Sequence, residues 1–288
     1  MSVKILRCGQ RELDLSRPVV MGVLNVTPDS FSDGGKYFRQ SQLSVDVVLR
    51  QAEAMVLSGA GVLDVGGEST RPGASPVSVS EEMDRVLPVI EQLNQQFDVV
   101  ISLDSSQPQV IASACKLGIG LINDVRSLAL PGALEVAATS GLPVCLMHMQ
   151  GDSPATMQLK PEYADVVEDV IDFLQQQVAR CQAAGIAADQ ILLDPGFGFG
   201  KSLGHNLALL NRLDQLVALG YPVLSGTSRK SMVGQVTGQP VDQRLAGSLA
   251  TVILAVQKGA ALIRVHDVAE TVDALNMLEA VCQEGWES

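Results

Sequence analysis

The amino-acid sequence predicts an α/β fold, a (β/α)8 TIM barrel preceded by a β-hairpin, on two observations. Short aliphatic runs alternate about eight times with amphipathic helical stretches along the 288 residues. Such alternation is typical of a parallel sheet, and this number of repeats suits a closed barrel, with an open doubly wound sheet as the runner-up. Glycine also recurs where the expected helices end. Because no linker-like composition shift divides the chain, residues 1–288 are expected to form a single domain.

The first expected element is the β-hairpin, over residues 3–16 (VKILRCGQRELDLS), which would close the floor of the barrel. Eight strands should follow, because their short and nearly continuous aliphatic runs are typical of strands buried on both faces of a parallel sheet. In chain order the runs read VVMGVL, GVLDV, VVISL, IGLI, LPVCLM, ILL, PVLS and AALIRV.

The helices expected between these strands keep a periodicity of 3.6 residues, which is clearest in 45–56 and 167–178. Each of six expected helices ends at a glycine just before the next aliphatic run. Glycine readily adopts the left-handed conformation that closes a helix, so these positions predict C-terminal caps. They are Gly59, Gly118, Gly141, Gly185, Gly220 and Gly259.

The composition excludes several classes of function. The formal charge is 20 − 32 = −12, so the chain lacks the basic surface that nucleic-acid binding requires. No apolar run is long enough to cross a bilayer, although residues 246–256 come closest, and the N-terminal residues include no apolar stretch long enough for a signal peptide. The five cysteines are scattered and form no CxxC pair, which suits reduced thiols. We therefore expect a cytoplasmic protein without nucleic-acid or membrane partners.

Hydrogen-bonding side chains follow all eight expected strands. A barrel carries its active site at the C-terminal ends of its strands. A single strand-end aspartate is often only a loop cap, but polar endings on every strand favour a functional site. The residues concerned are Asn25, Asp64, Glu68, Asp104, Asn123, Asp124, His148, Asp194, Ser225, Ser228, Lys230, Arg264 and His266.

Two groups stand out among these strand ends. Asp104, Asn123 and Asp194 follow very apolar strands, and buried carboxylates and amides need partners. Converging on one site, they would suit a flat ligand with several N–H donors, such as an amino-substituted heterocycle. The second group is cationic and falls near the last two strands, where barrels commonly bind phosphate. It comprises Asn25, Ser228, Arg229, Lys230, Arg264 and His266.

The stretch GTSRKS (226–231) is expected to open a helix, whose free N–H groups favour an anion. The alternative is a solvated basic loop beside an ordinary strand-end arginine. DPGFGFGKS (194–202) looks like a phosphate loop, but Pro195 stands where the Walker motif needs its first glycine. Its glycines are instead expected to let a loop turn tightly while carrying Phe197 and Phe199. Two long small-residue segments, 26–37 and 66–79, are expected to be lids.

Several segments resemble the dihydropteroate synthase family and occur in its order over nearly the whole chain. They are MGVLNVTPDSFSDGG (21–35), DVGGESTRPGA (64–74), SLDSSQP (102–108), INDVRSL (122–128), LMHMQG (146–151), ILLDPGFGFGK (191–201), GTSRKS (226–231) and the tail from RLAGSLA (244–250) to RVHDV (264–268). The resemblance implies a pterin-binding barrel that joins 6-hydroxymethyl-7,8-dihydropterin diphosphate to 4-aminobenzoate. The products would be 7,8-dihydropteroate and diphosphate, in folate biosynthesis.

The resemblance also implies how the pterin is held. Asp104, Asn123 and Asp194 would bind its N–H edge, and Lys230 its other polar side. Thr70 would contact the pterin substrate as well.

For the diphosphate, the resemblance implies contacts from Arg264, from the backbone of Val265 and from His266. The implied cofactor is Mg²⁺, bound by Asn25, with Asp33 as a second metal residue once the first loop closes. The pocket for 4-aminobenzoate would be shaped by Phe31, Arg71, Pro72, Phe199 and Ser231.

Lys230, Arg264, His266 and Asp104 are the expected catalytic residues. Because an aromatic amine is a weak nucleophile, we expect a largely dissociative reaction in which cations stabilise the departing diphosphate. The resemblance further suggests a homodimer and competition by sulfonamides, which mimic 4-aminobenzoate. One alternative is a methyltetrahydrofolate-binding methyltransferase of the same barrel type, which needs no diphosphate cluster; another is a non-catalytic pterin-binding protein, which leaves that cluster unexplained.

Overall fold

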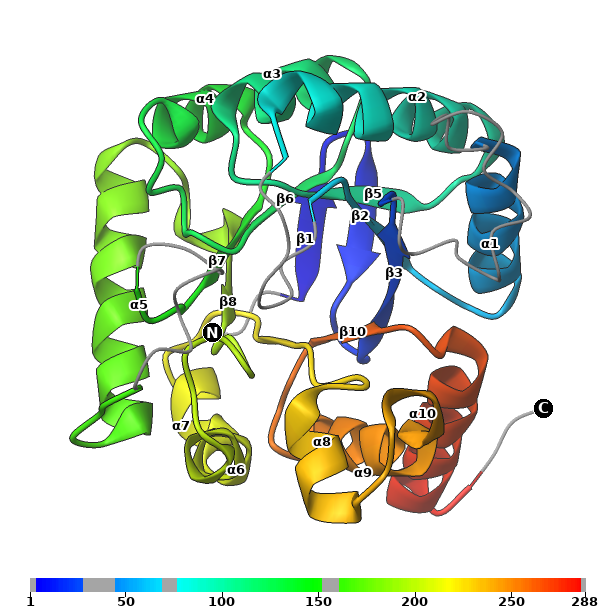
Figure 1. The fold of residues 1–288 in the computed structure, drawn as a ribbon, viewed down its shortest axis with the longest axis vertical. Helices are drawn as coiled ribbons and strands as arrows, with labels where there is room; N and C mark the ends of the chain where they lie inside the picture. The colour runs from blue at the N-terminus through cyan, green and yellow to red at the C-terminus, as the bar shows by residue number, and fades with distance from the viewer. Residues whose placement is uncertain (1–3, 28–44, 69–76, 152–160, 286–288) are drawn as a thin grey trace.

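Eight parallel strands form a ring in the computed structural model, which describes residues 4–27, 45–68, 77–151 and 161–285 (Figure 1). Neighbouring strands pair in the order β8-β7-β6-β5-β4-β3-β10-β9. A bridge between Leu193 and Val223 joins the two ends of this order, so the sheet closes as the sequence predicted and is not open. The strands are β3 (Val19–Asn25), β4 (Val62–Gly66), β5 (Val100–Asp104), β6 (Leu121–Asp124), β7 (Val144–Met147), β8 (Ile191–Asp194), β9 (Leu224–Ser225) and β10 (Leu262–Val265).

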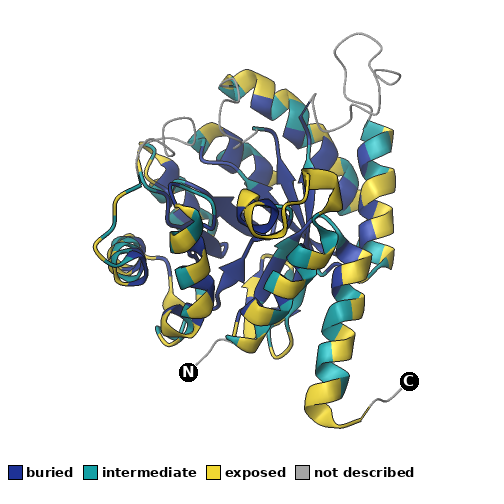
Figure 2. Cartoon of the chain, turned by 60° about the horizontal axis from the view of Figure 1, so that its bottom comes forward, coloured by how far each residue is buried: buried dark blue, intermediate teal, exposed yellow. Residues whose placement is uncertain are grey.

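Helices surround the strands and turn their buried faces towards them (Figure 2). All six glycines predicted to cap helices have positive φ, between 66° and 99°, which confirms that prediction. None of the described helices is long and apolar enough to cross a membrane. The helices are α1 (Val45–Leu57), α2 (Val79–Gln96), α3 (Pro108–Lys116), α4 (Ala133–Ser140), α5 (Val166–Ala183), α6 (Leu203–Asn211), α7 (Leu213–Val217), α8 (Ser231–Thr237), α9 (Leu245–Gln257) and α10 (Val268–Gln283).

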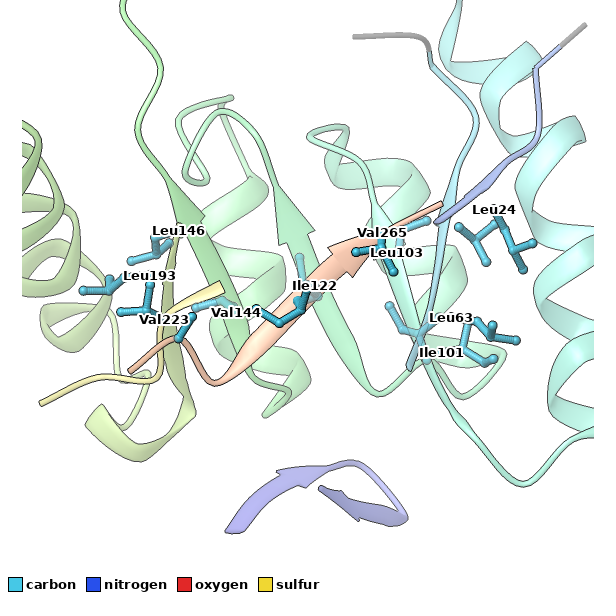
Figure 3. Packing of buried hydrophobic residues seen from close by; sticks show 14 of the residues in the cluster. Leu24, Leu63, Ile101, Leu103, Ile122, Val144, Leu146, Leu193, Val223 and Val265 are labelled. Carbon is cyan, nitrogen blue, oxygen red and sulfur yellow. The ribbon is translucent and has the colours of Figure 1, made fainter. Parts of the chain in front are cut away.

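The outer core lies between the strands and these helices (Figure 3). Because side chains alternate across a strand, every second residue points outward into it. On β5, for example, Ile101 and Leu103 are fully buried there, while Val100, Ser102 and Asp104 point into the barrel. Packing in the outer core fixes the orientation of each strand. It therefore determines which residues of the strand point into the barrel.

The floor of the barrel is apolar and is closed by the predicted hairpin, β1 (Ile5–Cys8) and β2 (Arg11–Asp14). Figure 1 shows this hairpin across the opening of the ring, and Figure 3 shows it below the N-terminal ends of the strands. Leu6, Cys8 and Leu13 form one buried apolar cluster with an inward-facing side chain from every barrel strand. Those side chains are Met21, Val62, Val100, Leu121, Cys145, Leu192, Leu224 and Leu262.

Two positions further along most strands the interior becomes polar. The period of two puts these residues on the inner face as well, one layer nearer the C-terminal ends. We call this layer the polar layer, and we include in it Asp104, which lies two positions after Ser102 on β5. Its members are Asp64, Ser102, Asn123, Asp194, Arg264 and Asp104.

Candidate active site

Asp64 is the centre of the polar layer. Its side chain has no exposed surface, and three neighbouring groups donate to its carboxylate. They are the hydroxyl of Ser102 at 2.6 Å, Nδ2 of Asn123 at 3.2 Å and Nε of Arg264 at 2.6 Å. A buried carboxylate needs such partners, and in meeting that need Asp64 fixes the orientation of groups from three other strands.

Arg264 connects Asp64 to Asp104. Its Nη2 donates to Oδ2 of Asp104 at 2.8 Å, while Nε is bound to Asp64. Burial raises the pKa of Asp104 to about 7, and the nearby Arg264 opposes that rise. Burial works against the charged form of Arg264, but Asp64 and Asp104 outweigh it and keep the arginine pKa above its usual value.

Asn123 has a defined amide orientation. Its Nδ2 donates to the Asp64 carboxylate, and its side chain is almost fully buried. Since the nitrogen of an amide donates and the oxygen accepts, Oδ1 is the atom available to a ligand. Asn123 therefore offers an acceptor, as Asp104 and Asp194 do.

Asp194 and Lys230 form a second charged pair of groups at the same end of the barrel. Asp194 accepts a hydrogen bond from the backbone N–H of Gly196 at 2.7 Å. Burial raises the pKa of Asp194, and the positive charge of Lys230 opposes this rise. Burial lowers the pKa of Lys230 to about 8, and Asp194 in turn opposes that change.

The Lys230 ammonium has two further contacts with the loop that follows β8. It donates to the carbonyl of Phe197 and lies 4.7 Å from the centre of the Phe199 ring. The Phe199 ring also packs on a small apolar cluster of Val125, Met147 and Met149. Phe199 is thus an aromatic surface beside Lys230, whereas Phe197, the other phenylalanine of this loop, is fully buried in the outer core.

The basic stretch after β9 divides into two parts. Arg229 forms a bidentate ion pair with Asp267, so it is already neutralised. The sequence grouped Arg229 with the anion-binding cations without foreseeing this partner from the next strand end. Ser228 instead contacts His266: its hydroxyl lies 3.1 Å from Nδ1 and accepts from the His266 backbone N–H at 3.2 Å.

The other predicted site residues have varied positions. Asn25 is the last residue of β3 and is partly buried, and Ser231 is exposed at the start of α8, the helix that the sequence expected there. The Val265 side chain is buried in the outer core, which leaves only its backbone for a ligand. Five predicted residues lie outside the described residues: Phe31, Asp33, Thr70, Arg71 and Pro72.

The linking role of Asp64 was missed by reasoning from the sequence. The sequence placed both Asp64 and Asp124 at strand ends, and Asp124 is indeed a loop cap. It accepts from the backbone N–H groups of Arg126 and Leu128, each at 2.8 Å. The alternation of side chains along the strand could have revealed this role. Asp64 lies two positions after the inward-facing Val62, as Asn123 lies two positions after Leu121, so both point into the barrel.

Comparison with known proteins shows which family has this fold and this sequence. The profile of a family described as pterin binding enzymes matches residues 21–266. A dihydropteroate synthase of Escherichia coli is 55% identical over 93% of each chain. Among solved structures, a Yersinia pestis dihydropteroate synthase with a sulfonamide drug has a TM-score of 0.91 and 53% identity, covering 97% of this chain and 99% of that one. A Xanthomonas albilineans dihydropteroate synthase with 4-aminobenzoic acid has a TM-score of 0.91 and 48% identity, covering 98% and 99%.

A TIM barrel with this polar layer at the C-terminal ends of its strands is a pterin-binding enzyme by fold and by profile. The match in sequence and in structure extends over nearly the full length of the relatives as well as of this chain. The chain belongs to the dihydropteroate synthase family, and it is accordingly a transferase.

Proposed function

We propose that the protein joins 6-hydroxymethyl-7,8-dihydropterin diphosphate to 4-aminobenzoate, forming 7,8-dihydropteroate and diphosphate for folate biosynthesis. The observation that carries this proposal is the arrangement of the polar layer. Acceptors suited to a pterin ring and cations suited to a diphosphate meet there, joined by the 2.8 Å contact between Arg264 and Asp104. The 4-aminobenzoic acid bound to the Xanthomonas albilineans relative supports the choice of second substrate.

The pterin is assigned to the acceptor side of the layer. Asn123 Oδ1, with the carboxylates of Asp104 and Asp194, would accept from the N–H groups of the ring edge. Lys230 would donate to the opposite polar side, and Thr70 would add a further contact. A ligand that satisfies these groups replaces the water they would otherwise need, which gives the site its specificity for a heterocycle with N–H donors.

The diphosphate is assigned to Arg264, the backbone of Val265 and His266. Arg264 uses Nε and Nη2 for Asp64 and Asp104. Its Nη1 makes no hydrogen bond to the described part of the chain and would serve the phosphate. Because both carboxylates keep this arginine charged, it can stabilise negative charge as it develops on the leaving group.

A magnesium ion fits this assignment. Mg²⁺ prefers hard oxygen ligands and is often held by one or two protein groups together with substrate phosphates. Asn25 offers one such oxygen at the end of β3, Asp33 is proposed as the second, and no cluster of three or more acidic, histidine or cysteine residues is built for a metal among the described residues. When bound, the ion would supply positive charge beside the departing diphosphate.

Catalysis is assigned mainly to departure of the leaving group, since the attacking aromatic amine is a weak nucleophile. Arg264 and His266 would stabilise the diphosphate as the methylene C–O bond breaks. The carboxylates of Asp104 and Asp194 would favour the positive charge that the electron-rich pterin then shares. The amine forms the new C–N bond and afterwards loses its proton to solvent, and Lys230 holds the ring throughout.

The 4-aminobenzoate is assigned to the aromatic surface beside Lys230. Phe199 lies there, and Ser231 begins α8 directly after Lys230. Phe31, Arg71 and Pro72 complete this proposed pocket from segments outside the described residues. We also propose that the enzyme acts in the cytoplasm as a homodimer, as the family resemblance implied.

The direct test incubates the purified protein with Mg²⁺, the pterin diphosphate and 4-aminobenzoate, and measures dihydropteroate and released diphosphate by chromatography. We expect equal amounts of the two products. Omission of either substrate or chelation of the metal should abolish product, and a sulfonamide should raise the KM for 4-aminobenzoate without changing kcat.

Two outcomes would contradict the proposal. Pterin binding without any product would leave only a binding protein, and diphosphate release without dihydropteroate would indicate a hydrolase. The dissociative path has a separate test without the amine. The pterin diphosphate carries ¹⁸O at the oxygen that bridges the methylene carbon and phosphorus, and the position of this label is followed. Migration of the label to non-bridging positions of recovered substrate supports bond breakage before attack, and a fixed label contradicts it.

A further inference from the structure

We propose that Lys201 is a positioning residue whose buried amino group holds the loop after β8 in the shape that places Phe199 and the ammonium of Lys230. This loop, residues 195–202, is the glycine-rich stretch that resembles a phosphate loop in sequence. The inference deepens the proposed function and rests on it, because Phe199 and Lys230 are the groups assigned there to 4-aminobenzoate and to the pterin.

The side chain of Lys201 is enclosed by its own loop and by the residue that follows β7. Its side chain is 4% exposed, and Nζ lies close to four atoms that can pair with it. Nζ donates to the carbonyls of Gly196 at 2.9 Å, Phe199 at 3.1 Å and His148 at 3.2 Å, and it lies 2.9 Å from Nδ1 of His148. A side chain so enclosed has no surface left for substrate, so any effect on the reaction must pass through the groups it holds.

The contacts of Lys201 brace the turn from within. The backbone N–H of Phe199 donates to the carbonyl of Gly196 at 3.1 Å, and Lys201 binds the carbonyls of these same two residues. Its contacts with His148 fasten the turn to the end of β7. The fit against β7 is close, since a Cβ atom on Gly196 would lie 1.9 Å from the carbonyl oxygen of His148.

The braced loop provides a carbonyl and an aromatic ring that contact the Lys230 ammonium. The carbonyl of Phe197 accepts from the Lys230 ammonium, and the Phe199 ring lies below it at 4.7 Å. Without the Lys201 amino group, the buried carbonyl of Gly196 and the partly buried carbonyl of Phe199 each lose a donor, which is costly unless the turn rearranges. A rearranged turn moves Phe197 and Phe199, and therefore changes the contacts and the position of the Lys230 ammonium.

Other hydrogen bonds to the loop should preserve its general course when Lys201 is changed. Gly198 donates to Asn206 at 2.7 Å, and the Tyr163 hydroxyl donates to the carbonyl of Gly200 at 2.8 Å. The expected result of losing Lys201 is thus a shifted loop in a folded barrel, with effects concentrated on 4-aminobenzoate and on Lys230.

The test replaces Lys201 with methionine, which keeps the length of the side chain but donates no hydrogen bond. Lys258→Met, on the partly exposed lysine that pairs with Asp214, is the matched control. We expect Lys201→Met to raise the KM for 4-aminobenzoate at least ten-fold, more than the KM for the pterin diphosphate. The alkaline limb of the pH–rate profile should move to lower pH, because the Lys230 ammonium loses a carbonyl acceptor that favours its charged form. A general loss of stability would not move that limb.

A double-mutant cycle with Phe199→Leu tests the route. If Lys201 acts through Phe199, the double variant should have nearly the same KM for 4-aminobenzoate as the worse single variant, whereas independent effects would multiply. His148→Leu, which removes the imidazole contact and keeps Lys201, serves if Lys201→Met does not fold. It should change the same constants by a smaller factor, and His148→Gln should restore them in part.

An unchanged KM for 4-aminobenzoate together with an unshifted alkaline limb, in a folded Lys201→Met or His148→Leu variant, overturns the positioning role. Multiplicative effects in the cycle overturn the route through Phe199. Failure of the proposed function is a different result, since the wild-type protein would then form no dihydropteroate at all.

Discussion

The two ends of the barrel interior are built from the same strands but have opposite chemistry. At the N-terminal end the inward side chains are apolar and the hairpin seals them with Leu6, Cys8 and Leu13. Two positions later the same strands carry Asp64, Arg264 and their neighbours, which pair with one another. Two residues along a strand therefore separate a layer that stabilises the fold from a layer that can bind a ligand.

The difference lies in what each layer requires. Burial of the apolar floor is favourable in itself. Burial of the polar layer is costly, and the ion pairs around Arg264 only offset that cost. Substitutions in the floor should therefore reduce the stability of the fold, whereas substitutions in the polar layer should mainly reduce activity.

The largest effect is expected at Lys230. Removing a charged contact from an enclosed site typically weakens transition-state stabilisation by about 4 kcal/mol, so Lys230→Ala should lower kcat/KM about a thousand-fold. Steady-state kinetics with both substrates checks this. Asp104→Asn should act in the same direction and somewhat less strongly. Turnover at the wild-type rate by either variant would remove that residue from the mechanism.

A floor substitution should show the reverse pattern. Leu6 is fully buried against the strand side chains, and Leu6→Ala should lower the free energy of unfolding by about 3 kcal/mol through lost burial and a cavity. Urea unfolding followed by circular dichroism gives this value. The kcat/KM per folded molecule should stay within about two-fold of wild type. A large fall in that constant would mean that the two layers are coupled.

The polar layer should also make activity depend on pH. Burial raises the pKa of Asp104 to about 7, so its carboxylate form is present above that pH. Burial lowers the pKa of Lys230 to about 8, so its ammonium form is present below that pH. The kcat/KM for the pterin diphosphate should thus rise through the first value and fall through the second. In Lys230→Arg, whose side chain stays charged, the fall on the alkaline side should disappear; its persistence would assign that limb to another group.

The smallest effect is expected at the turn of the hairpin. Gly9 has a φ of 67°, a left-handed conformation that costs other residues about 1 kcal/mol. Gly9→Ala should reduce the free energy of unfolding by about that amount, because the new Cβ meets only ordinary contacts at 3.5 Å or more. The same urea experiment measures it. A loss as large as that of Leu6→Ala would show that the turn itself, rather than the apolar seal, limits the floor.

Most of the fold could be predicted because its signals are local. The aliphatic runs, the helical periodicity and the glycine caps each depend on a few adjacent residues, and the structure confirms them. Much of the site could not, because partners come from distant strands. Arg229 and Lys230 are adjacent in sequence, yet one is neutralised by Asp267 and the other faces Asp194. Asp64 and Asp124 differ only in the three-dimensional partners of otherwise similar strand-end carboxylates.

The hairpin that closes the floor has a consequence for synthesis of the chain on the ribosome. Leu6 precedes Leu262 by more than two hundred residues, yet both belong to the same apolar cluster. A nascent chain that lacks β10 has neither a closed ring nor the complete apolar surface on which the hairpin packs. The apolar side chains of the hairpin stay exposed or transiently covered until β10 has been made, and contacts between such distant residues form slowly. A molecular chaperone that covers apolar side chains would protect this hairpin during that interval.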